Sequence, residues 1–571
     1  MSAVPSQPTP LPQKPESLDP PEPRLLPGIW FWCWLAFAIV LIVIVQVPFL
    51  HENVWGALVT ADNAVGNLIT QALIVVTYIA FSFWLLAFSS HPWFVRLIPV
   101  GVVILLLILF RPGYPNGEMW FQWEPRWKKA HDETLAVPPL AQNSEKDSKE
   151  ADPSQPKNEA PPALTPVSIT AEDFPEFLGA GRLASIGSVK LARDWEAQPP
   201  KEIARWKVGA GWSGFAVVGD KAVTMEQRGQ AELVTCYNWR TGELLWSCGS
   251  EARHTNAMGG IGPRSVPTIT PEGEVFALGA TGWLYALDFA TGREIWKKQL
   301  LFEIGIKQSE DEQLVMWGRS ASPLVVDDLV IIPLGGPKEK TASLVAYDRK
   351  TAKERWRSGT HQVSYASPIL ATLAGARQII SVNEDNVTGH DPVKGTQLWE
   401  LPFSGSSTAN ANVSQPWVLP GDKLLLSKGY GTGASCYQVS KKGDTWSFEP
   451  LWGSEGRTVL KTKFTNLVLH NNHAYGLDDG TLQCVDLETG EMKWKKGRYG
   501  QGQILGVGDL IVVQSEPGSV FLVEANPEEH VELGKLEALH SQTWNNLALA
   551  GPHLIVRSAE EAASYLLPTQ K

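Results

Sequence analysis

An Asp or Asn that is followed eight positions later by Trp recurs five times between residues 238 and 494. Four copies also carry Gly four positions after the Asp or Asn, as in Asp288, Gly292 and Trp296. Asp and Asn side chains accept hydrogen bonds from the backbone of a turn, and Gly tolerates the positive φ of a tight hairpin. Because apolar residues precede each copy, the repeat predicts a series of β-hairpins with Trp on the second strand. The copies are Asn238–Trp246, Asp288–Trp296, Asp348–Trp356, Asp391–Trp399 and Asp486–Trp494.

Trp residues continue this period beyond the five complete copies. Trp206 and Trp452 lack the full motif but fall in phase, and the intervals between successive Trp positions are 40 to 60 residues. One four-stranded propeller blade has this length. One large indole per blade, buried against its neighbour, would remove much apolar surface from water. The predicted docking residues are Trp206, Trp246, Trp296, Trp356, Trp399, Trp452 and Trp494.

The two ends of this region complement each other. Residues 544–566 predict three strands without an outer strand, and residues 203–208 predict an outer strand without a blade before it. Residues 503–533 supply one more blade, which has no Trp on its fourth strand. Joining the two ends would close the ring and leave no open sheet edge. We therefore expect an all-β, eight-bladed β-propeller.

The repeats resemble the tryptophan-docking motif of the pyrroloquinoline-quinone-like (PQQ-like) propeller superfamily. The matching strings are LYALDFATGREIW at residues 284–296 and CVDLETGEMKW at residues 484–494, and the resemblance covers roughly residues 170–571. The string DFPEFLG at residues 173–179, followed by Trp195, resembles bacterial quinone-binding-like repeat proteins that are common in planctomycete-type bacteria. The superfamily includes quinone-dependent alcohol dehydrogenases and non-catalytic binding propellers, such as the lipoprotein of the outer-membrane barrel-assembly machine. The motif is thus specific for the fold and poor for the activity.

The first third of the chain predicts a membrane anchor. Residues 1–25 are Pro-rich and predict a disordered tail. Apolar runs at residues 28–50, 68–88 and 93–110 are each long enough to span a bilayer, and aromatic residues flank them as expected at membrane interfaces. We expect three transmembrane helices within residues 26–112, then a juxtamembrane segment and flexible linker at residues 113–168, and a quinoprotein-like propeller at residues 169–571. The alternative, buried helices of a soluble domain, would require polar faces that these runs lack.

The distribution of charge suggests which side of the membrane holds the propeller. The loop of residues 51–66 contains Glu52 and Asp62 and no basic residue, whereas the tail contains Lys14 and Arg24. The positive-inside rule then places the tail in the cytoplasm, although four basic residues within 111–129 favour the opposite orientation. By analogy with the resembled propellers we expect a bacterial inner membrane with the propeller in the periplasm. A net charge of −11 argues against nucleic acid as a partner.

Catalytic residues are not evident in the sequence. The resemblance implies that a quinone-dependent dehydrogenase needs a carboxylate base and a calcium site of Glu, Asn and Asp oxygens. Many such enzymes also contain a disulfide between adjacent cysteines, and this chain has no Cys-Cys pair. We therefore assign no catalytic or metal residue, expect no cofactor, and favour a binding or scaffold module for protein or cell-envelope partners. The alternative is a membrane-anchored alcohol or sugar dehydrogenase that uses PQQ with calcium.

Polar clusters near predicted strand ends are candidates for a site in the central funnel. Oxygen-rich side chains there could bind a cation or a polar ligand, but Asn and Asp also make ordinary turns, which is the favoured interpretation. Two lysines could place positive charge at the funnel mouth or could protect a strand edge. Two cysteines flank one hairpin and could form a disulfide or pack as small buried side chains. These candidates are Asn383, Glu384, Asp385 and Asn386, with Asn410 and Asn412; Lys461 and Lys463; Trp317, Arg319 and Ser320; and Cys236 and Cys248.

Overall fold

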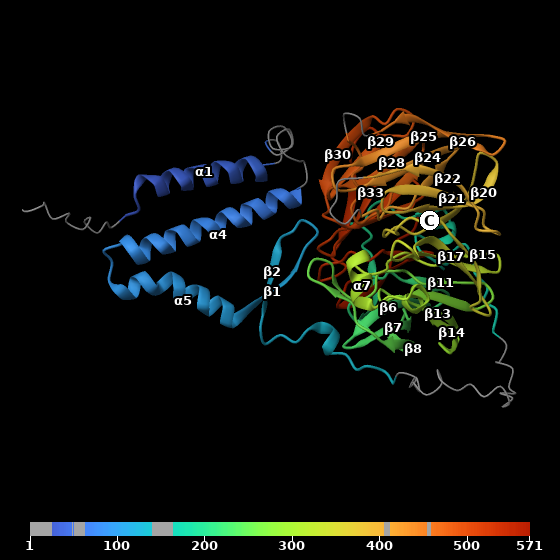
Figure 1. Ribbon diagram of the computed structural model, residues 1–571, viewed down its shortest axis with the longest axis horizontal. Helices are drawn as coiled ribbons and strands as arrows, with labels where there is room; N and C mark the ends of the chain where they lie inside the picture. The colour runs from blue at the N-terminus through green and yellow to red at the C-terminus, as the bar shows by residue number, and fades with distance from the viewer. Residues whose placement is uncertain are drawn as a thin grey trace, which may run out of the picture.

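A computed structural model describes residues 26–47, 50, 63–139, 164–404, 411–453 and 458–570. Helices lie on one side, a β-propeller lies on the other, and a β-hairpin lies between them (Figure 1). The predicted tail at residues 1–25 lies outside the described residues, as do residues 140–163 of the predicted linker.

The predicted eight-bladed propeller is confirmed. Seven blades each contain four consecutive antiparallel strands, and an eighth combines strands from the two ends of the propeller region. The first four blades are β5–β8 (Ala216–Val218, Lys221–Arg228, Ala231–Asn238, Glu243–Glu251), β11–β14 (Thr268–Ile269, Glu274–Leu278, Trp283–Asp288, Glu294–Gln299), β15–β18 (Leu324–Val326, Leu329–Gly335, Ala342–Asp348, Glu354–Ser358) and β19–β22 (Ile369–Leu373, Ala376–Val382, Asn386–His390, Gln397–Pro402). The next three are β23–β26 (Trp417–Leu419, Lys423–Lys428, Gly433–Lys442, Thr445–Trp452), β27–β30 (Val468–His470, His473–Asp478, Thr481–Asp486, Met492–Arg498) and β31–β34 (Gln503–Val507, Leu510–Gln514, Val520–Glu524, Glu532–Leu536).

The closing blade joins distant parts of the chain. Strands β35 (Ala548–Ala550), β36 (His553–Arg557) and β37 (Glu561–Leu566) pair in order, and β4 (Lys201–Lys207) completes the sheet. Ala562 lies opposite Trp206 in this antiparallel pairing. The ring therefore has no open edge at this position, as the sequence predicted.

The repeated Trp residues contact the following blade. Trp246 Nε1 donates a hydrogen bond to the carbonyl of Phe289 at 3.1 Å, and Trp356 Nε1 donates to that of Pro392 at 3.3 Å. Gly292 and Gly395 have φ of +73°, and a Cβ at either position would lie 2.5 Å from the preceding indole. Gly is therefore needed for both the backbone conformation and the close approach of the ring. Trp206, Trp246, Trp356, Trp399 and Trp494 are buried, and Trp296 and Trp452 are partly buried.

Two blades use a different contact at this interface. Trp399 Nε1 donates to the side chain of Gln378 in its own blade, and its ring packs on Phe448 in the long β25–β26 hairpin. The seventh blade has no Trp on β34, and Trp195 from the segment before the propeller packs against Gly534 instead. The sequence motif marked neither contact, because each depends on tertiary rather than local geometry.

The apolar N-terminal region forms three helices, of which two are long enough to be candidate membrane spans. These two are α1 (Ile29–Gln46) and α4 (Asn63–Phe88). The third, α5 (Trp93–Leu109), is apolar but has 17 residues and contains Pro99. The expectation of three spans is therefore supported for two helices only. Short helices α6 (Leu300–Ile304) and α7 (Gln308–Leu314) interrupt the propeller, and all five cysteines are free, including Cys236 and Cys248.

Candidate functional site at the propeller axis

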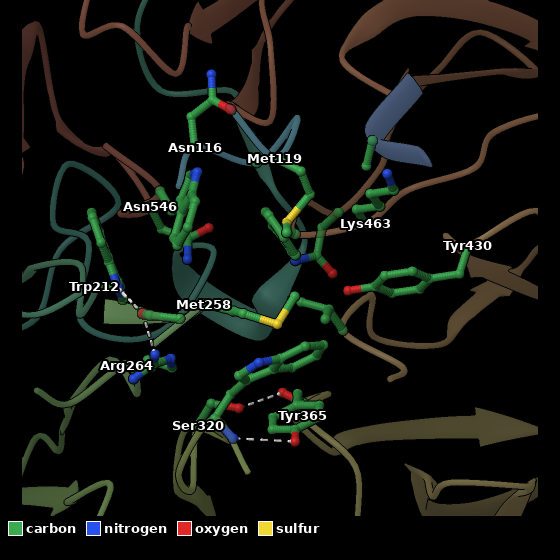
Figure 2. A pocket seen from close by; sticks show the side chains of 18 of the residues that line it. Asn116, Met119, Trp212, Met258, Arg264, Ser320, Tyr365, Tyr430, Lys463 and Asn546 are labelled. Atoms are coloured by element: carbon green, nitrogen blue, oxygen red, sulfur yellow. Dashed lines mark hydrogen bonds between the residues drawn. The ribbon is translucent and has the colours of Figure 1, made fainter. Parts of the chain in front are cut away.

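The two faces of the propeller are built from different connections. The turns between the first and second and between the third and fourth strands of each blade lie on one face, which we call the repeated face. The remaining turns and the links between blades lie on the opposite face, which we call the cavity face. On the cavity face these links surround a cavity of about 380 Å³ (Figure 2). Seven aromatic side chains line it: Phe177, Trp212, Trp317, Tyr365, Tyr430, Phe464 and Trp544.

A hairpin from the anchor covers the cavity. Strands β1 (Phe110–Pro115) and β2 (Phe121–Pro125) present a turn, residues 116–121, which we call the clamp. Asn116, Gly117 and Met119 line the cavity together with residues of the first turns of α4. The backbone N–H of Gly117 donates to the carboxylate of Glu516 at 2.5 Å. A Cβ on Gly117 would lie 2.4 Å from Cγ of Gln501, so this contact requires glycine.

The clamp is held from the membrane side as well. Asn67 donates from its side-chain amide to the carbonyl of Glu118, and Gln71 donates to that of Met119, both at 2.7 Å. The side chain of Gln46 on α1 donates in turn to Asn67 at 2.9 Å. Residues of both candidate spans thus fix the clamp that contacts the propeller. The flexible linker predicted at residues 113–168 implied that the propeller is held near the membrane without being fixed to it, whereas these contacts attach it more closely.

An ion pair also holds the clamp against the propeller. Arg498, at the end of β30, pairs with the carboxylate of Glu118. Burial raises the pKa of Glu118, and the positive charge of Arg498 opposes that rise.

The central channel of the propeller is also closed on the side of the cavity that lies away from the clamp. Residues 173–186, which we call the plug, cross the channel, and Phe177 reaches the cavity. Arg182 is buried in the plug, donates to the carbonyl of Pro368 at 2.8 Å and pairs with Glu176 at 3.0 Å. Strand β3 (Ser185–Ile186) then pairs in parallel with β31. The cavity is therefore bounded by propeller loops, the plug, the clamp and α4.

Arg264 is the distinctive charged group of the cavity wall. It donates to the carbonyl of Gly259, as Figure 2 shows, and to that of Gly262. Burial lowers its pKa to about 10. Among the described residues, no carboxylate acts on Arg264, whose pKa only the Tyr365 phenol raises, and no Asp or Glu lines the cavity. The Arg264 side chain is partly buried, and a guanidinium removed from water without an anionic partner is costly. This side of the wall therefore carries an uncompensated positive charge.

Neighbouring titratable groups respond to burial and to this charge. Burial, with a smaller contribution from Arg264, lowers the pKa of His254 to about 3, so this histidine is neutral at physiological pH. Burial raises the pKa of Tyr365 to about 12, so the phenol stays protonated. Neither group can therefore neutralise the guanidinium.

The two candidate lysines lie on the cavity face. Lys463 lines the cavity, lies 5.7 Å from the centre of the Tyr430 ring and pairs with Asp479 at 3.5 Å. Lys461 pairs with the same carboxylate at 2.6 Å. Both lysines therefore have an acidic partner, in contrast to Arg264.

Residues 203–496, slightly more than half of the chain, match the family model described as outer membrane protein assembly factor BamB. The chain belongs to this family. No curated protein sequence matches it. Among solved structures, BamB from Moraxella catarrhalis is 17% identical, with 64% of this chain and 100% of that chain covered and a TM-score of 0.46. The quinohemoprotein alcohol dehydrogenase ADHIIG from Pseudomonas putida HK5 is 12% identical, covers 70% and 81% respectively, and has a TM-score of 0.50. Such identities show a shared fold alone.

The predicted Asn-rich cluster lies in a turn of this BamB-family propeller, between β20 and β21. Asn383 is buried and donates to the side chain of Asn386 at 2.8 Å, and Asn412 donates to the carbonyl of Asn383 at 2.6 Å. Asp385 is exposed, and the pKa of the partly buried Glu384 is raised by burial. None of the four predicted residues lines the cavity, Asn410 lies outside the described residues, and no group of metal-binding His, Cys, Asp or Glu occurs in the described part.

Only part of the cavity could be anticipated from sequence. Two of the candidate residues, Trp317 and Ser320, line it, whereas the third, Arg319, is buried and pairs with Asp311 at 2.7 Å. Arg264, Met258 and the clamp carry no motif. The usable signal was weak: bulky aromatic residues lie in the links between predicted blades.

Proposed function

We propose that the protein is a membrane-anchored propeller that binds protein or cell-envelope partners and performs no chemistry. The clamp is the observation that carries this proposal. The anchor engages the cavity face through Gly117 and Glu118, so the repeated face and the rim of the disc are directed away from the clamp. Val393 is 69% exposed in one turn of the repeated face and marks a surface that a partner could contact.

The cavity wall supports a non-catalytic role. A calcium-dependent quinone site needs carboxylate oxygens for the ion and a carboxylate base. The described lining residues supply Arg264 and amides but no Asp or Glu, so this donor set does not fit calcium with the quinone. PQQ and calcium added to the purified full chain should give no alcohol- or sugar-dependent dye reduction. Stoichiometric uptake of the quinone with turnover would favour the alternative, a PQQ-dependent dehydrogenase.

Partner binding is tested by site-specific cross-linking. A photoreactive amino acid at Val393 should give a discrete cross-linked product in cell membranes, because this turn is exposed on the free face. The matched position is Met119, which faces the cavity and the clamp. Equal products from both positions, or none from Val393 and other positions on the repeated face, would contradict the proposal.

We also propose three membrane crossings, with the tail in the cytoplasm and the propeller in the periplasm of a bacterial inner membrane. The C-terminal ends of α1 and α5 and the N-terminal end of α4 all lie towards the propeller (Figure 1). Three crossings would then separate the tail from the propeller. Alkaline phosphatase fused to the C-terminus should be active, and activity of a cytoplasmic reporter at the same position would reverse the orientation.

A further inference from the structure

The cavity has the size and lining of a small-molecule site. Its volume of about 380 Å³ lies within the usual range of ligand pockets, which are mainly apolar with a few polar groups. Indole and phenol rings from several loops of the cavity face line its wall, and Met258 and Met119 extend into it (Figure 2). Aromatic rings and flexible thioethers suit an apolar ligand body.

One side of this wall is positively charged. Arg264 uses two of its N–H groups on carbonyl oxygens, and a guanidinium has five N–H donors in total. The nearby His254 is neutral, and no carboxylate among the described residues acts on Arg264. Both cavity-face lysines, by contrast, pair with Asp479. Arginine binds carboxylate and phosphate groups through charge-assisted hydrogen bonds. An anionic group beside Arg264 would therefore complete the wall.

Another side of the wall comes from a candidate membrane span. Ala64, Val65 and Leu68 lie in the first turns of α4 and line the cavity. The cavity consequently lies where an apolar helix meets the propeller, and a molecule dissolved in the membrane could enter beside this helix. A soluble polar anion would make no use of the apolar residues on this side of the cavity.

We propose that the cavity binds a lipid-like amphipathic anion from the membrane. Its carboxylate or phosphate group pairs with Arg264, and its apolar part contacts the aromatic wall and the start of α4. The inference depends on the membrane anchoring in the proposed function and is independent of protein partners and of orientation. It differs from a calcium-bound quinone site, because it requires no carboxylate in the wall.

Photolabelling of the full chain tests this site directly. The protein would be placed in phosphatidylcholine nanodiscs with a diazirine-bearing sixteen-carbon carboxylic acid, and labelled peptides would be mapped by mass spectrometry. We expect labelling of the peptides that contain Met258 and Phe464, and competition by excess oleate. The corresponding fatty alcohol should label these peptides at least about tenfold less, because it lacks the anion. Labelling of α1 and α4 by both probes would verify membrane insertion independently of the cavity.

Variants separate the charge from the shape of the cavity. Arg264→Gln should reduce cavity labelling by about tenfold or more, whereas Arg264→Lys should retain part of it. Met258→Trp should fill the cavity and reduce labelling while Arg264 remains. Arg377→Gln is the control, because Arg377 lies in an exposed ion pair with Asp327. Thermal melting would identify any variant that fails to fold, and oleate competition on the unchanged protein does not depend on variants.

Specific results would overturn the inference. These are labelling confined to the helices, equal labelling of the cavity by the acid and the alcohol, and equal labelling of the Arg264→Gln and Arg377→Gln proteins. If the helices also remain unlabelled, the membrane anchoring in the proposed function fails together with the cavity.

Discussion

The two faces of this propeller join their blades by different chemistry. On the repeated face an indole of one blade contacts a Gly-containing turn of the next and donates to its backbone, as Trp356 does with Pro392. On the cavity face buried polar side chains make the equivalent link. Glu232 of the first blade accepts from the backbone of Ala280 at 2.8 Å and from the hydroxyl of Thr281 at 2.7 Å in the second.

This difference separates structural from functional roles. The repeated face uses one local motif, so its geometry is the same at most blade interfaces. The cavity face has links of unequal length, one of which contains α6 and α7. This face also contains the charged cavity wall and is contacted by the clamp. Irregular loops on a rigid scaffold are where binding sites usually occur.

The largest expected effect tests the indole contacts. Trp356→Ala should lower the free energy of unfolding by about 3–5 kcal/mol, because it removes a buried aromatic ring from the blade interface. Trp212→Ala, which alters a partly buried ring of the cavity wall, should cost clearly less. Urea unfolding of the full-length variants in detergent would measure both. Equal losses of unfolding free energy in the two variants would show that the indoles of the repeated face stabilise the fold no more than the rings of the cavity wall.

The second-largest expected effect is the pH dependence of stability that comes from Glu232 on the cavity face. Burial raises the pKa of Glu232 from 4.5 to about 7, so the folded protein binds this proton more tightly than the unfolded chain. The protonated Glu232 side chain therefore contributes to the free energy of unfolding. This contribution is fully present below pH 4.5 and is lost as pH rises through about 7. Since one pKa unit corresponds to about 1.4 kcal/mol, the free energy of unfolding should fall by roughly 3 kcal/mol over this pH range.

Glu232→Gln should therefore remove most of this pH dependence, as measured by urea unfolding at pH 5 and pH 8. The destabilisation by Trp356→Ala should be the same at both values, because an indole does not titrate in this range. A pH-independent difference between the Glu232→Gln protein and the unchanged protein would show that this carboxyl is not perturbed.

A smaller, local effect is expected at the clamp. Gly117→Val should displace the turn from Gln501 and weaken the hydrogen bond to Glu516, at a local cost of about 1–3 kcal/mol. Hydrogen exchange at residues 116–121 should accelerate while the blades stay protected. Gly101→Ala is the matched control, because nothing lies within 4 Å of the added Cβ. Unchanged exchange in the Gly117→Val protein would mean that the clamp is not fixed by this contact.

The smallest effect concerns the exposed ion pair on the repeated face. Arg377→Ala should change the free energy of unfolding by less than about 1 kcal/mol, because its partner Asp327 is well exposed and solvent screens the pair at 2.9 Å. Urea unfolding at low and high salt would measure it. A loss as large as that from Trp356→Ala would show that charges, rather than indoles, join the blades there.

Local patterns in the sequence predict the blades, whereas contacts between distant parts of the chain could not be predicted from it. Trp296 and Gly292 belong to one hairpin, so their spacing reveals the fold directly. The clamp contact between Gly117 and Glu516 spans 399 positions and has no local signature. The sequence predicts a strand that starts at Trp544, but β35 begins at Ala548 and Trp544 lines the cavity. The arrangement of α4 and the cavity likewise depends on docking, which periodicity does not encode.

The composite closing blade has a consequence for biosynthesis. Arg205 on β4 forms an ion pair with Glu561, 356 residues further along the chain. A ribosome therefore produces β4 before its sheet partners, which follow all the other blades, so the emerging chain retains an unpaired strand edge until β35–β37 are synthesised. Premature termination would leave that edge permanently open, which makes such fragments natural targets for chaperones and proteases.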